Sequence, residues 1–350
     1  MNDLKDIHEE PGISGKPFFS ILIPVYNAGS YIEDCLNDIL RQDFHDWEII
    51  IVDDVSSDDS VAKAEAFSKA DPRISIFRSD KNSGGPHTPR ITAARHAKGE
   101  YVVPIDADDK VSDDLLKTLR ESIEVTNADM VIPEMWRLKE SSSYKILPLE
   151  YIDVSRTWKG RDLVEHTLCR WAIPMAGFAV RRDIYIEADK MISTEDRKSS
   201  FVDELLSRWI LFMCKSVYMC NARYFYRENS DSVTNVNIPR IIDSKLRLCD
   251  SLISMTASTF GENSHTHLKA LENKFNRAID LLRLINGSDL KRQQKSSAVR
   301  RISSSMEYLD LSRLKGKASP RYLALMSLPV PLARIALKIL DPVINLKNGI

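Results

Sequence analysis

The chain has 350 residues, of which 49 are Lys or Arg and 50 are Asp or Glu, so its formal net charge is −1. This length allows two domains, or one large domain with an appendage, and the near-zero charge gives no long-range field that would select nucleic acid. Five cysteines without a Cys-x-x-Cys pair predict neither a zinc site nor a disulfide framework, which favours a reducing compartment. Residues 1–16 lack the apolar core of a signal peptide, and no run of about 18 uncharged apolar residues predicts a transmembrane helix.

Apolar runs and helical patterns alternate in the first third of the chain. The expected strands are residues 18–25, 47–52, 74–78 and 101–105. The expected helices are residues 31–42, about 57–69 and 88–97. Ser57 is the expected N-cap of the second helix, and Ser112 resembles the N-cap of a further helix. This alternation predicts an α/β protein with a doubly wound, mainly parallel sheet and helices on both faces.

Polar residues follow three of the expected strands. They are Tyr26 and Asn27 after the first strand, Asp53 and Asp54 after the second, and Asp106, Asp108 and Asp109 after the fourth. Ligands of open parallel sheets bind outside the C-terminal strand ends, so one crevice is expected to collect an aromatic ring, an amide and five acids.

The three carboxylates after the fourth strand would repel one another unless something positive lies among them. A hard divalent cation shared with a substrate phosphate fits them best, and a solvated acidic turn before a helix is the alternative. No Gly-x-Gly-x-x-Gly follows the first strand and no Gly-x-x-x-x-Gly-Lys-Ser is present, which disfavours nicotinamide and P-loop enzymes.

Shorter elements are expected after residue 126, and only helices after residue 235. The expected elements are a strand at 127–132, an edge hairpin within 135–154, helices at 161–170 and 201–215, a short strand within 174–182, strands at 217–219 and 223–227, and helices at 240–259 and 267–285.

The last part of the chain differs in charge. Residues 291–350 hold twelve basic and three acidic residues, an excess of nine positive charges, and residues 322–346 are rich in apolar side chains. Apolar segments with spaced basic residues are typical of helices lying on an anionic membrane, which is the favoured interpretation. The alternative is a C-terminal helix that docks on the protein through its apolar face.

Four motifs, in this order and spacing, resemble family 2 glycosyltransferases, the inverting enzymes with the GT-A fold. They are Ser-Ile-Leu-Ile-Pro-Val-Tyr-Asn at 20–27, Ile-Val-Asp-Asp-Val-Ser-Ser-Asp at 51–58, Gly84-Gly85-Pro86 with Arg90, and Ile-Asp-Ala-Asp-Asp at 105–109. The resemblance covers about residues 18–230, and bacterial exopolysaccharide enzymes of the succinoglycan type are the nearest subgroup. It implies a Rossmann-like, mainly parallel GT-A sheet with a helical C-terminal extension. The expected organisation is a flexible segment 1–16, a glycosyltransferase domain 17–235 with a nucleotide-sugar half (17–132) and an acceptor half (133–235), and a helical region 236–350.

The resemblance also implies roles on the donor side. Pro24, Tyr26 and Asn27 would line the nucleotide pocket. Asp54, or its neighbour Asp53, would bind the uracil imide, which favours a UDP-sugar. Arg90 would meet the nucleotide phosphates as a charge-assisted donor, and Arg227 would contact the diphosphate from a closing loop, with a surface arginine as the alternative.

The Asp-x-Asp motif is Asp106 and Asp108. One carboxylate would reach the ribose or sugar, and Asp108 would bind Mn²⁺ or Mg²⁺ bridging the diphosphate, where the metal neutralises the leaving group.

The catalytic base of such enzymes lies at the start of a helix, in a Glu-Asp pair followed by Leu. Here the order is reversed, Asp203-Glu204-Leu205. Residue type favours Asp203 as the base and alignment to the leucines favours Glu204. The alternative is that both acids only favour a helix N-terminus. Two further departures are Ile91 in place of the frequent Asn and His87 in place of a small residue.

The predicted function is an inverting, metal-dependent hexosyl transfer from a nucleotide-sugar to a growing bacterial polysaccharide carried on a polyprenyl diphosphate. The predicted location is cytoplasmic, peripheral at the inner face of the cell membrane. One alternative is a non-catalytic relative that binds a nucleotide-sugar, supported by the reversed Asp203-Glu204 pair and by Ile91. A membrane-surface scaffold would not need the strand-end acids, and a nucleotidyltransferase would need a Gly-rich phosphate loop that is absent.

Overall fold

The computed structural model describes residues 5–6, 15–139, 142–146, 153–168, 175–227, 238–307, 309 and 313. The chain forms two compact units. The first comprises Met1–Lys198 and Val202–Val233, and the second comprises Ser199–Phe201 and Thr234–Ile350. Each unit has a hydrophobic core of its own.

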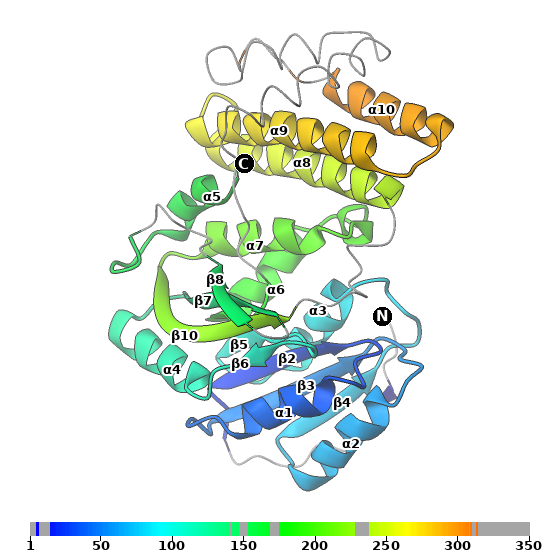
Figure 1. Cartoon of the computed structure of the whole chain (residues 1–350). Helices are drawn as coiled ribbons and strands as arrows, with labels where there is room; N and C mark the ends of the chain where they lie inside the picture. The colour runs from blue at the N-terminus through cyan, green and yellow to red at the C-terminus, as the bar shows by residue number, and fades with distance from the viewer. Residues whose placement is uncertain are drawn as a thin grey trace. The chain divides into compact units, whose positions relative to one another are not determined.

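The first unit is built on one mixed sheet (Figure 1), with the strand order β1-β4-β3-β2-β5-β9-β7-β10-β6 and β8 paired to β7. The strands are β1 (Lys5–Asp6), β2 (Phe19–Val25), β3 (Trp47–Asp53), β4 (Ile74–Arg78), β5 (Tyr101–Pro104), β6 (Lys110–Val111), β7 (Met130–Lys139), β8 (Ser142–Ile146), β9 (Ala179–Arg181) and β10 (Val217–Arg227). The four predicted strands β4, β3, β2 and β5 are parallel neighbours. Beyond them β9 runs antiparallel to β5 and β7, while β7 and β10 are parallel.

Seven α-helices among the described residues of the first unit accompany this sheet. They are α1 (Ile32–Leu40), α2 (Ser60–Ala70), α3 (His87–His96), α4 (Leu115–Thr126), α5 (Gly160–Leu168), α6 (Arg182–Lys190) and α7 (Val202–Met213). Strand β2 is buried along its whole length, and its alternate residues Phe19, Ile21, Ile23 and Val25 enter a core shared with α1 and α4. Helix α3 also contacts β2 and β3, and its buried residues lie outside that core. Both faces of the strand are therefore covered, as the continuous apolar run predicts.

Two predicted helix caps are wrong. The N-cap residue of α2 is Asp59 rather than Ser57, and that of α4 is Asp114 rather than Ser112. The reason is that both hydroxyls bond to residues far away in the sequence. Ser57 Oγ donates to Asn27 Oδ1 after β2 at 3.3 Å, and Ser112 Oγ accepts from Arg223 N in β10 at 3.1 Å. The two strands expected at 217–219 and 223–227 are one strand, β10, with a register shift between Met219 and Arg223.

The second unit contains three α-helices among its described residues, α8 (Ile238–Phe260), α9 (His265–Gly287) and α10 (Arg292–Met306). The first two confirm the predicted helices. Ser264 caps α9 by accepting from His267 N, and Gly261 turns the chain between the two helices with φ +88°. Ile242, Phe275 and Ile302 bring one side of each helix into the common core.

The apolar and basic segment at 322–346 lies outside the described residues, so the prediction of a membrane-bound tail stays a prediction. Within the part of the chain that the structure describes, no helix is long and apolar enough to cross a membrane.

Candidate active site

The turn after β2 carries the predicted nucleotide-pocket residues. Pro24 is buried within β2, whereas Tyr26 is 55% exposed just beyond the strand. Asn27 takes a left-handed backbone conformation (φ 50°), which Asn tolerates better than most residues. Its N–H donates to Ser56 Oγ at 3.0 Å, so the turn after β2 is tied to the turn after β3. Of the three predicted pocket residues, Tyr26 and Asn27 are exposed and Pro24 is buried.

The two acids at the end of β3 have different surroundings. Asp53 accepts from Ser56 N at 3.1 Å and pairs with Arg78 at 3.1 Å, so it holds the local turn together. Asp54 accepts from the N–H and the hydroxyl of Ser83, each at 2.9 Å. Burial raises the pKa of Asp54, and the hydrogen bonds from Ser83 oppose that shift. The Asp54 side chain therefore contacts the Gly-rich loop before α3 through Ser83, whereas the Asp53 side chain is bonded to Ser56 and Arg78.

The acidic turn after β5 contains one carboxylate that the fold uses internally. Asp109 is 1% exposed and accepts from the Tyr224 hydroxyl at 2.6 Å and from Arg227 N at 2.9 Å. The same hydroxyl accepts from Asp106 N at 3.1 Å. Burial raises the pKa of Asp109, and the charges of Asp106 and Asp108 raise it further. Negative charge is thus concentrated at this turn, and Asp106 and Asp108 are its partly exposed members.

This arrangement fits a hard divalent cation at Asp108, with Asp106 beside it. Carboxylate oxygens are suitable ligands for Mg²⁺ or Mn²⁺, and the concentrated charge favours a cation. In the described ranges no group of three or more His, Cys, Asp or Glu could hold a metal by itself. Mg²⁺ in phosphate-processing sites is held by one or two carboxylates and completed by substrate phosphates, which this pair of acids allows.

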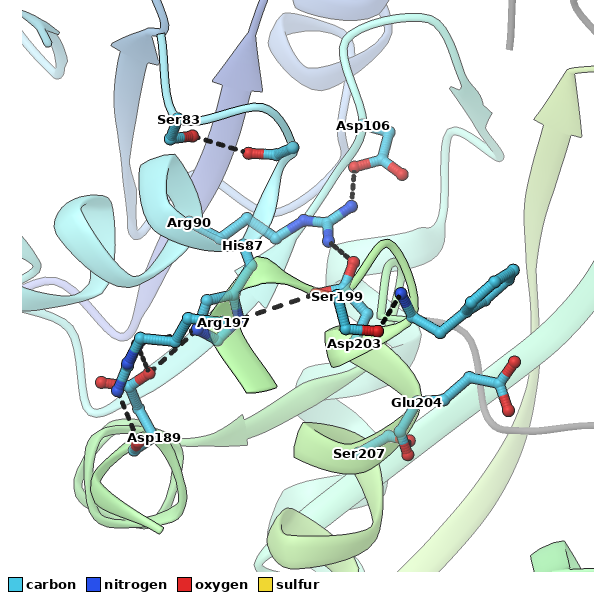
Figure 2. A network of polar contacts seen from close by, with 12 residues as sticks. Ser83, His87, Arg90, Asp106, Asp189, Arg197, Ser199, Asp203, Glu204 and Ser207 are labelled. Carbon is cyan, nitrogen blue, oxygen red and sulfur yellow. Dashed lines mark hydrogen bonds and ion pairs between the residues drawn. The ribbon is translucent and has the colours of Figure 1, made fainter. Parts of the chain in front are cut away.

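Arg90 links two carboxylates that are far apart in the sequence (Figure 2). This α3 residue is 3% exposed, and its Nη atoms pair with Asp106 after β5 and with Asp203 in the first turn of α7, the latter at 2.5 Å. Burial alone would raise the pKa of Asp203, but the charges of Arg90 and His87 lower it to about 2. We call Arg90, Asp106 and Asp203 the Arg90 bridge.

The neighbouring acid Glu204 points away from the Arg90 bridge (Figure 2). It lies 3.7 Å from Arg208 Nη1, one turn further along α7, and Arg208 also donates to Thr167 O at 2.8 Å. Asp203, not Glu204, is therefore the α7 acid that Arg90 links to Asp106 after β5.

Arg227 does not join the Arg90 bridge. Its backbone N–H donates to Asp109, and its guanidinium lies 3.7 Å from Asp34 and 4.9 Å from the centre of the Tyr31 ring at the start of α1. Its predicted contact with a diphosphate stays a prediction.

Sequence reasoning missed three residues around the site. Tyr224 holds the acidic turn, and Asp189 and Arg197 pack against His87 next to Asp203. His87 stands out only as a departure from a motif. Tyr224 begins the segment that resembles the family's closing loop around Arg227, but nothing in that motif gives it a role at the acidic turn, and Asp189 and Arg197 belong to no motif. Tyr224 and Arg197 lie more than 100 residues from their partners Asp109 and His87 in the sequence, so residue spacing gives no sign of these contacts.

Residues 20–185 match the family model described as Glycosyl transferase family 2. Glycosyltransferase GlyG of Streptococcus pneumoniae is 35% identical over 222 residues, which cover 61% of this chain and 72% of that protein. TarS of Staphylococcus aureus, named as a poly(ribitol-phosphate) beta-N-acetylglucosaminyltransferase, is 34% identical over 119 residues, 33% of this chain and 21% of that protein. A Campylobacter jejuni protein named as a GalNAc(5)-diNAcBac-PP-undecaprenol beta-1,3-glucosyltransferase is 34% identical over 105 residues, 30% of this chain and 34% of that protein.

Among solved structures, residues 1–349 of S. aureus TarS in complex with UDP-GlcNAc are similar to this chain. The TM-score is 0.65 at 17% identity, and the match covers 95% of this chain and 92% of that one. At this identity the likeness shows the fold alone. The fold is the predicted GT-A fold with a helical C-terminal region.

Proposed function

Because this chain belongs to glycosyltransferase family 2, we propose that it transfers a hexose from a UDP-sugar, with inversion, to a growing bacterial surface glycan. The observation that carries the proposal is the Arg90 bridge. One buried guanidinium holds a carboxylate of the Asp-x-Asp turn and a carboxylate of α7. Donor-side and acceptor-side acids thereby become parts of one site.

Asp203 is the base in this proposal. A pKa of about 2 keeps its carboxylate ionised at neutral pH, which is the form that a general base must have to accept the proton of an acceptor hydroxyl. That hydroxyl oxygen attacks the anomeric carbon from the face opposite the nucleoside diphosphate. The carbon–oxygen bond to the diphosphate breaks, and the configuration is inverted. Glu204, which faces Arg208, has no part in the step.

On the donor side, Asp54 is the proposed partner of the uracil imide, since its carboxylate lies against the Gly-rich loop at Ser83, whereas that of Asp53 is held in its own turn by Ser56 and at the end of β4 by Arg78. Tyr26 is accessible for packing against the base, and Pro24 and Asn27 shape the turn below it. The choice of UDP is supported by TarS, a structural neighbour that was crystallised in complex with UDP-GlcNAc. Arg90 and Arg227 remain the proposed cations for the diphosphate.

Asp108, with Asp106, would hold Mn²⁺ or Mg²⁺ next to the donor diphosphate. A metal bound there supplies Lewis-acid neutralisation of the leaving group. This chain's own contribution is to keep the turn fixed. Tyr224 and Arg227 N hold Asp109, and Arg90 holds Asp106.

The proposed acceptor is a glycan on a polyprenyl diphosphate at the cytoplasmic face of the cell membrane. The name of the C. jejuni relative includes undecaprenol with a diphosphate. The excess of nine positive charges in residues 291–350 suits an anionic membrane surface.

The deciding experiment is UDP release by purified protein with a panel of UDP-sugars, using bacterial membranes as the acceptor source. We expect release with one donor when Mn²⁺ or Mg²⁺ is present, and its loss with EDTA. Binding of UDP without release from any donor would replace this proposal with the non-catalytic relative. If UDP release persists in EDTA, the proposed sugar transfer stands but its proposed dependence on a metal ion is wrong.

A further inference from the structure

Asp203 has two carboxylate oxygens with different surroundings. Oδ2 lies 2.5 Å from Arg90 Nη1, whereas Oδ1 faces His87 Nδ1 at 3.7 Å. Among the described residues, these two facing atoms are both buried and neither has a hydrogen-bond partner at ordinary distance. A buried carboxylate oxygen without a partner is costly, so a small closing movement of the ring or the carboxylate would be favourable.

The other side of the His87 ring is firmly held. Its Nε2 lies 3.1 Å from Asp189 Oδ1 on α6 and 2.9 Å from Arg197 Nη1. Arg197 also donates to Asp189 Oδ1 at 2.6 Å and to Asp189 O at 2.8 Å. Arg95 lies 3.4 Å from the second Asp189 oxygen. His87 and Asp189 are 3% and 2% exposed and Arg197 is half-buried, so this His87 cluster (His87, Asp189 and Arg197) has a buried centre.

The contacts of Nε2 are linked to the protonation of Nδ1, because Nε2 lies near both a donor, Arg197, and an acceptor, Asp189. If the imidazole is neutral and Nε2 accepts from Arg197, the proton is on Nδ1. If the ring is an imidazolium, both nitrogens carry a proton, and Nε2 donates to Asp189. Burial lowers the pKa of His87, but Asp189 and Asp203 outweigh it and raise the pKa above the usual value. In these two forms an N–H at Nδ1 points toward Asp203, whereas a neutral ring protonated at Nε2 would donate to Asp189 and leave Nδ1 without a proton.

We propose that His87, held by Asp189 and Arg197, is a positioning residue that fixes the buried Oδ1 of Asp203, so that Oδ2, already paired with Arg90, presents its remaining lone pair to the acceptor hydroxyl. The charged or titratable groups around the ring are Asp203 from α7, Asp189 from α6 and Arg197, with Arg90 on its own helix behind Asp203. The inference rests on the proposed function, because it presumes that Asp203 is the base. It assigns a role to the position where this chain departs from its family motif.

Two substitutions separate the two ring nitrogens. Asn can place an amide N–H near the position of Nδ1, whereas Gln reaches the position of Nε2. We expect His87→Gln to lower kcat by about 10- to 100-fold, as supporting residues of catalytic groups commonly do, with donor affinity changed less than about twofold. His87→Asn should recover most of the lost kcat. His96→Gln, an exposed histidine at the end of the same helix, is the matched control.

A pH profile adds a readout that a purely structural role would not move. Loss of the N–H donor removes a group that favours ionised Asp203, so the pKa of Asp203 should rise in His87→Gln. As the pH is lowered, the kcat of this variant should therefore begin to fall at a higher pH than the kcat of the wild type. Equal kcat values and acid limbs in His87→Gln and wild type would overturn the proposal. The proposal would also be overturned if His87→Gln and His87→Asn lost the same amount of kcat and the same amount of thermal stability.

The contact itself can be tested without turnover. In ¹⁵N NMR spectra, the His87 Nδ1 signal should be that of a protonated nitrogen and should shift in Asp203→Asn. If Asp203→Asn keeps full activity, the proposed base is wrong, whatever His87 does. If Asp203→Asn is inactive while His87→Gln is fully active and the Nδ1 signal does not respond, only the positioning role fails.

Discussion

At the residue scale, Asp203 and Glu204 are sequence neighbours with opposite expected effects. Asp203→Asn removes the proposed base from the Arg90 bridge, so we expect turnover to fall by about 10²- to 10⁴-fold. Glu204→Gln changes a side chain that faces Arg208, so turnover should stay near wild type. UDP release under saturating donor measures both, with UDP affinity measured by calorimetry. The reverse ranking would assign the base to Glu204, as alignment to the leucines predicts.

A second residue-scale prediction concerns the sign of the pH dependence of stability. The pKa of Asp203 is depressed to about 2 in the folded protein. The ionised Asp203 carboxylate therefore adds to the free energy of unfolding above its unfolded pKa of about 3.8, and this stabilisation is lost as the pH falls toward 2. The pKa of Asp109 is raised in the folded protein. The protonated Asp109 carboxyl therefore adds to the free energy of unfolding below its unfolded pKa of about 3.8, and this stabilisation is lost as the pH rises through the folded pKa.

At neutral pH, therefore, Asp203→Asn should lower the free energy of unfolding by on the order of 2 kcal/mol. Asp109→Asn should leave it unchanged or higher, because Asn can still accept from Arg227 N without burying a charge. Denaturant unfolding from pH 7 downward measures both differences. A destabilised Asp109→Asn at pH 7 would mean that its charge is needed by the Tyr224 hydroxyl.

At the element scale, the acidic turn depends on how β10 packs against the chain before β9. Gly177 has φ +82°, donates to Pro104 O at 2.7 Å, and a Cβ there would lie 2.5 Å from the Tyr224 ring. Gly177→Ala should displace Tyr224 and with it Asp106 and Asp109, lowering both thermal stability and turnover. Gly287→Ala, where a Cβ meets nothing within 4 Å, is the control and should change neither. Unaltered turnover in Gly177→Ala would show that Tyr224 does not fix the turn.

Element prediction from the sequence worked where burial alone decides the pattern. The apolar run 18–25 predicts a strand correctly because all seven residues of β2 are buried. The caps failed because Ser57 and Ser112 bond to side chains and strands that local sequence cannot reveal. Strand β6 has two residues, too few to show a period, whereas β9 lies within the short strand expected at 174–182.

The same limit applies to the site. The four motifs and the reversed acid pair identified Arg90, Asp106 and Asp203 as candidates, but their meeting is a property of the tertiary fold. His87 and Asp189 are 102 residues apart, and no spacing rule joins them. The candidate catalytic and binding residues could thus be predicted from the sequence, whereas the neighbouring residues that orient them could not.

At the scale of the whole molecule, charge is unevenly distributed along the chain. The excess of nine positive charges in residues 291–350 contrasts with a net charge of −1 for the whole chain. Basic residues near an anionic bilayer each contribute about 1 kcal/mol to binding, and salt screens that attraction. A chain shortened at residue 317 loses the apolar segment 322–346 and four of the twelve basic residues.

We therefore expect the full chain to sediment with vesicles containing phosphatidylglycerol, and to do so less as salt is raised. The chain shortened at residue 317 should remain in the supernatant while still releasing UDP from a soluble acceptor analogue, because the Arg90 bridge lies within the first unit. Vesicles of phosphatidylcholine alone are the control for apolar binding without charge. If the shortened chain binds anionic vesicles as well as the full chain does, residues 318–350 are not the membrane contact, and the peripheral location loses its support.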